Sequence, residues 1–124
     1  MFKAICLIRR KPGMTREAFI DRYENGHAVL CAKLIPGMVG YVRRYVVPDQ
    51  TFLYPGAPDL DFDVLTELWY ENRKAYEASM KSLEDPAAAH ALAEDERKLF
   101  DLSSIRRFIV EERTSALPPG GSGQ

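Results

Sequence analysis

The sequence has few of the residues on which metal-bound and disulfide-rich proteins depend. Its 124 residues include only two cysteines and two histidines, and neither a CxxC pair nor an HExxH motif occurs. This scarcity argues against a disulfide framework and against a dedicated metal site. Cys6 and Cys31 both lie in apolar runs. We therefore expect two small buried thiols in a reducing compartment.

The chain also lacks an excess of charge and a long apolar run. Lys and Arg total 17 against 18 Asp and Glu, so no net field attracts nucleic acid or anionic lipid. Three basic doublets occur within strand-like runs, where side chains alternate between faces: Arg9-Arg10, Arg43-Arg44 and Arg106-Arg107. No stretch approaches membrane-spanning length, and the start is too quickly basic for a signal peptide. We expect a cytoplasmic protein with neither a nucleic-acid partner nor a membrane partner.

What remains is typical of one globular domain. Hydrophobic residues make up 46% of the chain and charged residues 28%, an ordinary balance for a folded protein. A chain of 124 residues encloses a single modest core. The end of the sequence, LPPGGSGQ, has the composition of a linker. We assign residues 1–113 to the domain and 114–124 to a flexible C-terminal tail.

The order of the predicted elements indicates an α+β fold. Runs of β-branched and aromatic residues predict four strands, at residues 2–10, 38–47, 62–70 and 105–112. Helices are predicted from a cap at Thr15 to about Leu34, from a cap at Asn72, and from a cap at Asp85 to about Phe100. The order β-α-β-β-α-β, with the second helix broken in two, predicts a ferredoxin-like fold. Its four-stranded antiparallel sheet has helices on one face.

The predicted sheet has a second apolar face that these helices cannot cover. In residues 38–47 both sets of alternating side chains are largely apolar, and an uncovered apolar face needs a partner. We expect a second copy of the chain, which makes the protein a homodimer. The connection at residues 49–61 is long and carries Phe52, Leu53 and Tyr54. Its aromatic content favours a flap or a dimer clasp over a loose tether.

The first helix contains the candidate catalytic residues. At helical spacing one face collects Phe19, Ile20, Tyr23, His27, Leu30, Cys31 and Leu34. His27 lies near the middle of this sheet-directed face, where an imidazole costs desolvation unless both ring nitrogens find partners. One interpretation is a core histidine satisfied by the sheet. The other is a histidine that lines a cavity and transfers protons, with Tyr23 beside it. Gly26 precedes His27 in mid-helix, which indicates either a close approach of another group to that turn or crowding between helix and sheet.

Aromatic and charged residues on the strands are candidates for the ligand-binding wall. Tyr41, Arg43 and Tyr45 share one strand face, and Glu67 and Trp69 share another. Such a set suits an aromatic ligand. Arg43 either holds an anionic group of the ligand or pairs with Glu67, and we slightly favour the pair. Tyr45 and Trp69 are more often core residues than ligand contacts. With Phe19 these five complete the predicted ligand-binding set.

Three segments carry a resemblance to a known family. They are KPGMTREAFIDRYENGHA, KLIPGMVGY and the strand ELWY. Together they resemble the EthD family, within the wider group of dimeric α/β barrels, over roughly residues 3–112. The resemblance implies a ferredoxin-like protomer, a barrel formed by two sheets, and a pocket between helices and sheet. It places the family histidine at His27. The chain departs from the family pattern at Arg22-Tyr23 and at Val29, which changes the pocket walls.

The resemblance also implies a class of function. Members look like accessory proteins of ether degradation or cofactor-free enzymes acting on aromatic, polyketide-like compounds. We therefore expect a cofactor-independent dehydratase, decarboxylase, cyclase or oxygenase with His27 as general acid or base and with Tyr23 orienting the substrate. The alternative is a non-catalytic dimer that binds a small apolar compound in a catabolic pathway. We expect no metal and no cofactor: haem on His27 is conceivable, but nothing in the sequence calls for it.

Overall fold

A computed structural model describes residues 1–120. The antiparallel sheet has the strand order β2-β3-β1-β4, which is the ferredoxin-like arrangement predicted from the sequence. The strands are β1 (Phe2–Arg10), β2 (Gly40–Tyr45), β3 (Val64–Tyr70) and β4 (Phe100–Val110). The helical elements are α1 (Arg16–Arg22), the π-helix η1 (Tyr23–His27), α2 (Ala28–Leu34), the 3-10 turn η2 (Pro48–Gln50), α3 (Arg73–Ser82) and α4 (Pro86–Glu96).

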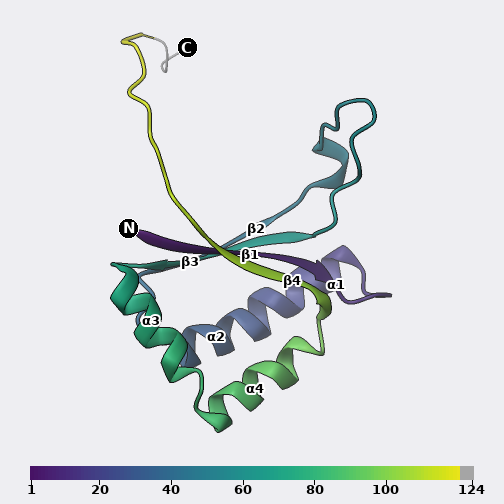
Figure 1. The fold of residues 1–124 in the computed structure, drawn as a ribbon. Helices are drawn as coiled ribbons and strands as arrows, with labels where there is room; N and C mark the ends of the chain where they lie inside the picture. The colour runs from purple at the N-terminus through teal and green to yellow at the C-terminus, as the bar shows by residue number, and fades with distance from the viewer. Residues whose placement is uncertain (121–124) are drawn as a thin grey trace.

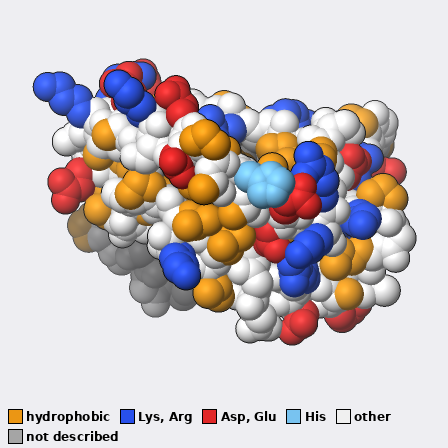
Figure 2. Space-filling view, turned by 90° about the horizontal axis from the view of Figure 1, so that it is seen from below, with side chains coloured by type: hydrophobic (Ala, Val, Ile, Leu, Met, Phe, Trp, Pro, Cys, Tyr) orange, Lys and Arg blue, Asp and Glu red, His pale blue; other side chains and the backbone are white. Residues whose placement is uncertain are grey.

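All the long helices lie on one side of the sheet, as Figure 1 shows. Two clusters of buried side chains join them to it. The larger cluster includes Phe19, Tyr23, Val64 and Phe100, and the smaller one centres on Tyr70. Seen from this helical side, the surface intersperses hydrophobic, acidic and basic side chains (Figure 2). The helices therefore meet the solvent with a mixed surface and the sheet with an apolar one.

The helix starts form where capping residues predict them. Thr15 accepts a hydrogen bond from the backbone N–H of Ala18, and Asn72 accepts one from Ala75. Asp85 caps α4 through the N–H of Ala88, with Pro86 at the first helical position. Each cap satisfies a backbone donor that the helix itself leaves without a partner. These three predicted caps are confirmed.

The first helix differs from its prediction at its centre. Residues 16–34 form one helical rod, but Tyr23–His27 is a π-helix in which the N–H of Ala28 bonds to the carbonyl of Tyr23, five residues earlier. The wider turn shifts the face that points to the sheet. Beyond it Cys31 is buried as predicted, but the other buried side chain is Ala28, while Leu30 and Leu34, which the 3.6-residue period also predicts to be buried, are only half-buried. A single π turn of this kind is frequent at functional sites.

The last strand begins earlier than predicted, at Phe100 rather than residue 105, and α4 ends at Glu96 rather than near Phe100. The reason is an irregular stretch in the middle of β4. The pairing of β1 with β4 shifts register between Leu7 and Arg9, where Ser104 Oγ accepts the N–H of Arg9 at 2.8 Å. The segment Asp101-Leu102-Ser103-Ser104 is poor in strand formers. Its residues therefore gave no strand signal.

No helix of residues 1–120 covers the other face of the sheet (Figure 1). Pairing register and side-chain alternation place six apolar side chains there: Ile5, Leu7, Val42, Leu65, Trp69 and Phe108. The segment between β2 and β3 and the chain after β4 both extend away from the helices in Figure 1. In the former, Phe52 is 81% exposed and Tyr54 74%. Whether that segment is a flap, a clasp or a tether stays a prediction.

The predicted tail is described only in part. Residues 111–118 form no helix or strand, and 119–120 form a turn; the remaining predicted tail residues, 121–124, lie outside the described part of the chain. Among residues 1–120, no helix is long and apolar enough to cross a membrane.

Candidate functional site

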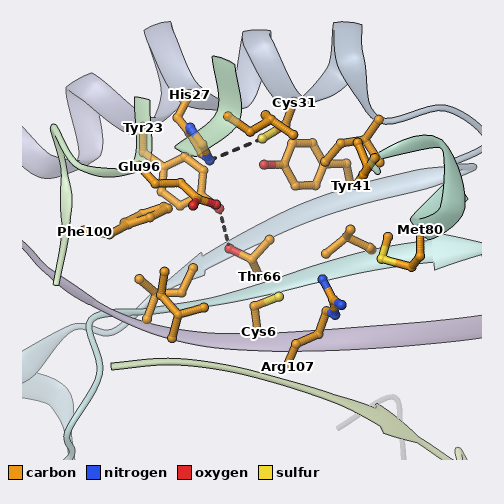
Figure 3. Close-up of a pocket in the computed structure, with 16 residues that line it drawn as sticks. Cys6, Tyr23, His27, Cys31, Tyr41, Thr66, Met80, Glu96, Phe100 and Arg107 are labelled. Carbon is orange, nitrogen blue, oxygen red and sulfur yellow. Dashed lines mark hydrogen bonds between the residues drawn. The ribbon is translucent and has the colours of Figure 1, made fainter. Parts of the chain in front are cut away.

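A cavity of about 150 Å³ lies between the helices and the sheet (Figure 3). The π-helix η1 and α2 line one side of the cavity, residues of the four strands line the opposite side, and α3 and α4 line a third. Its apolar walls are Ile8, Ile35, Leu68, Met80, Leu83 and Leu92. A cavity of this volume with such a lining holds a benzene-sized molecule. The size therefore suits one substituted ring.

His27 faces this cavity from the π-helix and is only 3% exposed. Its Nδ1 lies 2.8 Å from Oδ2 of Asp95 on α4. Because a carboxylate only accepts hydrogen bonds, Nδ1 carries the proton in this pair, and Nε2 of the neutral ring bears the free lone pair. The aromatic rings of Tyr23 and Phe100 pack edge-on against the imidazole, with centroids at 5.6 and 5.1 Å. The ring is thus fixed in both tautomer and orientation.

Asp95 is itself held from its other side. Nη2 of Arg22 donates to Oδ1 of Asp95 at 2.5 Å. The guanidinium of Arg22 crosses directly over Gly26, where a Cβ carbon, if the residue had one, would lie 3.5 Å from Cζ. Gly26 therefore gives the arginine a flat surface, which is the close approach that its mid-helix position indicates. Arg22, Asp95 and His27 form one chain of charge-assisted hydrogen bonds that ends at the cavity.

Cys31, one turn after His27, lies against Nε2 with its sulfur at 3.3 Å. Burial raises the pKa of the Cys31 thiol to about 11, so the group is an S–H that donates to the imidazole. A nucleophilic cysteine needs a lowered pKa. The pair is therefore no Cys–His nucleophile, and the S–H instead covers the lone pair of Nε2. Figure 3 shows this contact as a dashed line.

The hydroxyl of Tyr23 also has a buried partner. It lies 2.8 Å from Oγ1 of Thr66 on β3, and both residues are only 2% exposed. Burial raises the pKa of the Tyr23 phenol well above its ordinary value, so the hydroxyl stays protonated and acts only as a hydrogen-bonding group. We refer to Tyr23, His27 and Thr66 as the cavity floor. Each of these three side chains has a polar partner.

Two charged side chains of the cavity have no such partners among the described residues. Glu96 on α4 and Arg107 on the edge strand β4 both line the space (Figure 3). Burial raises the pKa of the Glu96 carboxyl. Within residues 1–120 neither side chain forms a hydrogen bond or an ion pair. Arg107 is exposed to solvent, so the cavity is open beside Arg107. We refer to Glu96 and Arg107 as the cavity mouth.

A known family model matches this chain. The model of the EthD domain matches residues 11–103, which is most of the chain. The chain belongs to the EthD family. This confirms the resemblance seen in the sequence. A search of curated proteins finds no match.

Solved structures share the fold of this EthD protein. An EthD family protein of Bacillus halodurans is 22% identical, with a TM-score of 0.60 over 91% of this chain and 100% of that one. The Arabidopsis thaliana protein At3g17210 is 18% identical, with a TM-score of 0.63 over 94% and 100%. A Streptomyces coelicolor monooxygenase, solved with the ligand nanaomycin D, is 14% identical, with a TM-score of 0.56 over 94% and 91%. At these identities the likeness is one of fold.

Of the six predicted ligand-binding residues, only Tyr41 lines the cavity of this EthD protein. Phe19 is fully buried in the larger core cluster. Arg43 and Tyr45 are on the helical side of the sheet, but both bond to Glu24 of the π-helix, Arg43 through two nitrogens at 2.7 and 2.9 Å. They thus tie β2 to the helix rather than line the space.

Glu67 and Trp69 lie on the other face of the sheet, because Thr66 and Leu68 of the same strand point into the cavity. Nε of Arg44 and Nε1 of Trp69 both donate to the Glu67 carboxylate. The predicted pairing of Arg43 with Glu67 is therefore wrong. Register decides it: Arg43 and Glu67 are on opposite faces of the sheet, while Arg44 and Glu67 share the uncovered one.

Three polar residues of the site had no signal in the sequence: Asp95, Glu96 and Arg107. The first two belong to the alanine-rich helix whose charged residues look solvated, and His90 on that helix is indeed exposed. Only the docking of α4 against the π-helix turns Asp95 towards His27. As for metals, the described residues contain no group of three or more His, Cys, Asp or Glu that would hold an ion.

Proposed function

We propose that this EthD protein is a cofactor-independent enzyme that moves a proton on a small aromatic or enolic compound, with His27 as general base and acid. One observation carries the proposal: the Nδ1 of His27 is held by Asp95 while Nε2 turns to an apolar cavity of ring size. A fixed imidazole with a carboxylate behind it is a recurrent arrangement for proton transfer.

The expected chemistry follows from the two ends of that imidazole. Nε2 removes a proton from an activated C–H of the substrate and leaves an enolate or phenolate. Asp95 then faces an imidazolium, whose charge it stabilises. The imidazolium returns that proton to a leaving hydroxyl in a dehydration, or to the new alkoxide oxygen when the enolate closes a ring on a carbonyl carbon. In a decarboxylation no C–H proton is removed; an imidazolium protonated from solvent gives its proton to the carbon that loses CO2. The Streptomyces neighbour, a monooxygenase solved with nanaomycin D, supports an aromatic, polyketide-like substrate, although the cavity volume favours a single ring.

The alternative is a non-catalytic binding protein, and the Cys31 contact favours it. The S–H covers the lone pair of Nε2 at 3.3 Å, so an unoccupied cavity presents no free base. A protein that only stores or presents an apolar compound needs nothing more. The two functions differ in whether a bound ring with an acidic C–H loses its proton.

The probe 5-nitrobenzisoxazole tests this difference. A base removes its ring C–H proton, the N–O bond breaks, and a coloured cyanophenolate forms, without metal or cofactor. We expect the wild type to exceed free imidazole at equal concentration, and His27→Ala to lose on the order of 10²-fold or more. His90→Ala, which removes the exposed histidine, serves as the control. Added imidazole, which fits the vacated space, is expected to restore part of the rate.

Two results would contradict the enzyme. The first is a wild-type rate no higher than that of free imidazole. The second is a folded His27→Ala protein, judged by circular dichroism, that retains the full rate. Either one leaves the binding protein as the better account, provided that the probe still raises the melting temperature.

We also propose that the protein is a homodimer through the uncovered face of its sheet. Six apolar side chains lie there, and Phe108 is 42% exposed although it is a large aromatic residue. Apolar area of this kind is typical of an interface. Sedimentation velocity is expected to give a dimer that Phe108→Glu converts to a monomer. Val29→Glu, at an exposed apolar position on the helical side, leaves the dimer intact. A monomeric wild type would refute the proposal.

A further inference from the structure

The mouth of the cavity has an arginine that forms no ion pair with any carboxylate of the described residues. Arg107 is opposite Cys6 in the β-ladder, and both line the cavity; Figure 3 shows the guanidinium of Arg107 on the cavity side. A guanidinium has five donors in a planar fork that matches a carboxylate. In the described chain this fork makes no hydrogen bond or ion pair.

Other strand arginines differ from Arg107 in this respect. Arg43 pairs with Glu24, Arg44 with Glu67, and Arg106 with Asp61, each at 2.9 Å or less for its closest contact. Arg106 is adjacent to Arg107 in sequence but lies on the opposite face of the sheet. These three arginines thus have acidic partners. The side chain of Arg9 on β1 has no hydrogen bond or ion pair in the described chain either, but Arg9 does not line the cavity, whereas Arg107 does.

We propose that the cavity selects a single-ring aromatic acid, whose carboxylate binds the Arg107 fork while its ring lies on the apolar walls. This deepens the proposed function, because the same ring then presents its far side to His27. The volume of about 150 Å³ suits a ring of this size. The difference in exposure sets the direction: Arg107 is at the open end, and His27 is at the closed one.

Glu96 adds a second feature of the ligand. Its carboxyl lies across the cavity from Arg107 in Figure 3 and, like Arg107, has no hydrogen-bond partner within residues 1–120. A ring hydroxyl would donate to it, and burial of the ionised carboxylate without such a donor is costly. A ring that carries both a carboxylate and a hydroxyl therefore satisfies both groups of the mouth at once.

Benzoate and benzamide test the inference, because they share shape and differ in charge. By calorimetry or by NMR titration, wild-type protein is expected to bind benzoate on the order of tenfold more tightly than benzamide. Arg107→Gln removes that preference and leaves benzamide binding as it was. The matched control is Arg106→Gln, which makes the same change in charge at the adjacent position and is expected to keep the preference.

Three outcomes would overturn the inference: equal affinity for the two compounds in the wild type, an Arg106→Gln protein that loses the preference as Arg107→Gln does, or an Arg107→Gln protein that keeps it. The first would mean that Arg107 and Glu96 satisfy each other in solution. The result is separable from the proposed function. A wild type that shows no benzoate preference but keeps the His27-dependent elimination refutes only the aromatic acid, whereas a wild type that shows the preference without elimination refutes only the enzyme.

Discussion

At the cavity floor, Tyr23, His27 and Thr66 are at most 3% exposed, and each side chain has a polar partner. At the cavity mouth, Glu96 and Arg107 face the same space and form no hydrogen bond or ion pair in the described chain. The floor therefore contributes to stability, since it satisfies groups that are costly to bury. The mouth does not contribute to stability in this way, and charged groups left without partners are typical of binding sites. Changes at the floor should reduce stability and rate, while changes at the mouth should alter selectivity and can even increase stability.

The sharpest test of the floor is Asp95→Asn, which changes the hydrogen-bond partner of His27. The amide keeps the shape of the carboxylate but offers the imidazole no charge, and it can bind the wrong tautomer. We expect the rate with 5-nitrobenzisoxazole to fall on the order of 10²-fold or more, because orientation and charge behind the imidazole are lost together. Glu94→Gln, an exposed position on the same helix, is the control.

A rate for Asp95→Asn close to that of the wild type would mean that Asp95 only joins α4 to the π-helix. A merely structural role would lower the melting temperature without altering the dependence of the rate on pH. The pH profile of the elimination therefore separates positioning of His27 from simple cohesion.

A smaller effect is expected where the floor is only structural. Tyr23→Phe leaves Oγ1 of Thr66 buried without its partner at 2.8 Å, which should cost about 1–3 kcal/mol in the free energy of unfolding. The double variant with Thr66→Val replaces both polar groups and should recover part of that loss. Urea denaturation of the four proteins measures the coupling. Additive losses in this cycle would show that the hydrogen bond contributes nothing.

The same comparison explains what the sequence could predict. His27 and Tyr23 were accessible because a polar ring at helical spacing on an apolar face has to be buried, and the caps at Thr15, Asn72 and Asp85 follow from local chemistry. The π turn was not accessible, because a 3.6-residue period has no place for an extra residue. The strand residues Arg43 and Glu67 illustrate a further limit: which face a strand residue occupies depends on register, and only the assembled sheet fixes it.

Site residues from the second half of the chain were harder still to predict from the sequence. Asp95 and Glu96 are adjacent, yet one holds His27 from behind and the other faces the cavity. In a helical wheel both look like members of a solvated acidic run. Their roles arise from the angle at which α4 crosses the π-helix, a tertiary feature that no local pattern encodes.

The smallest expected effect is at the cavity mouth, where a substitution should raise stability rather than lower it. Burial raises the pKa of Glu96 above the 4.5 of a free side chain, so the folded protein holds this proton more tightly than the unfolded chain does. As pH rises from below 4.5 through the folded value, the wild type loses stability that a Gln variant keeps. Glu96→Gln should therefore match the wild type near about pH 4 and melt a few degrees higher near about pH 7. A variant less stable than the wild type at neutral pH would mean that the Glu96 carboxylate has a favourable partner in solution, and the mouth would then resemble the floor.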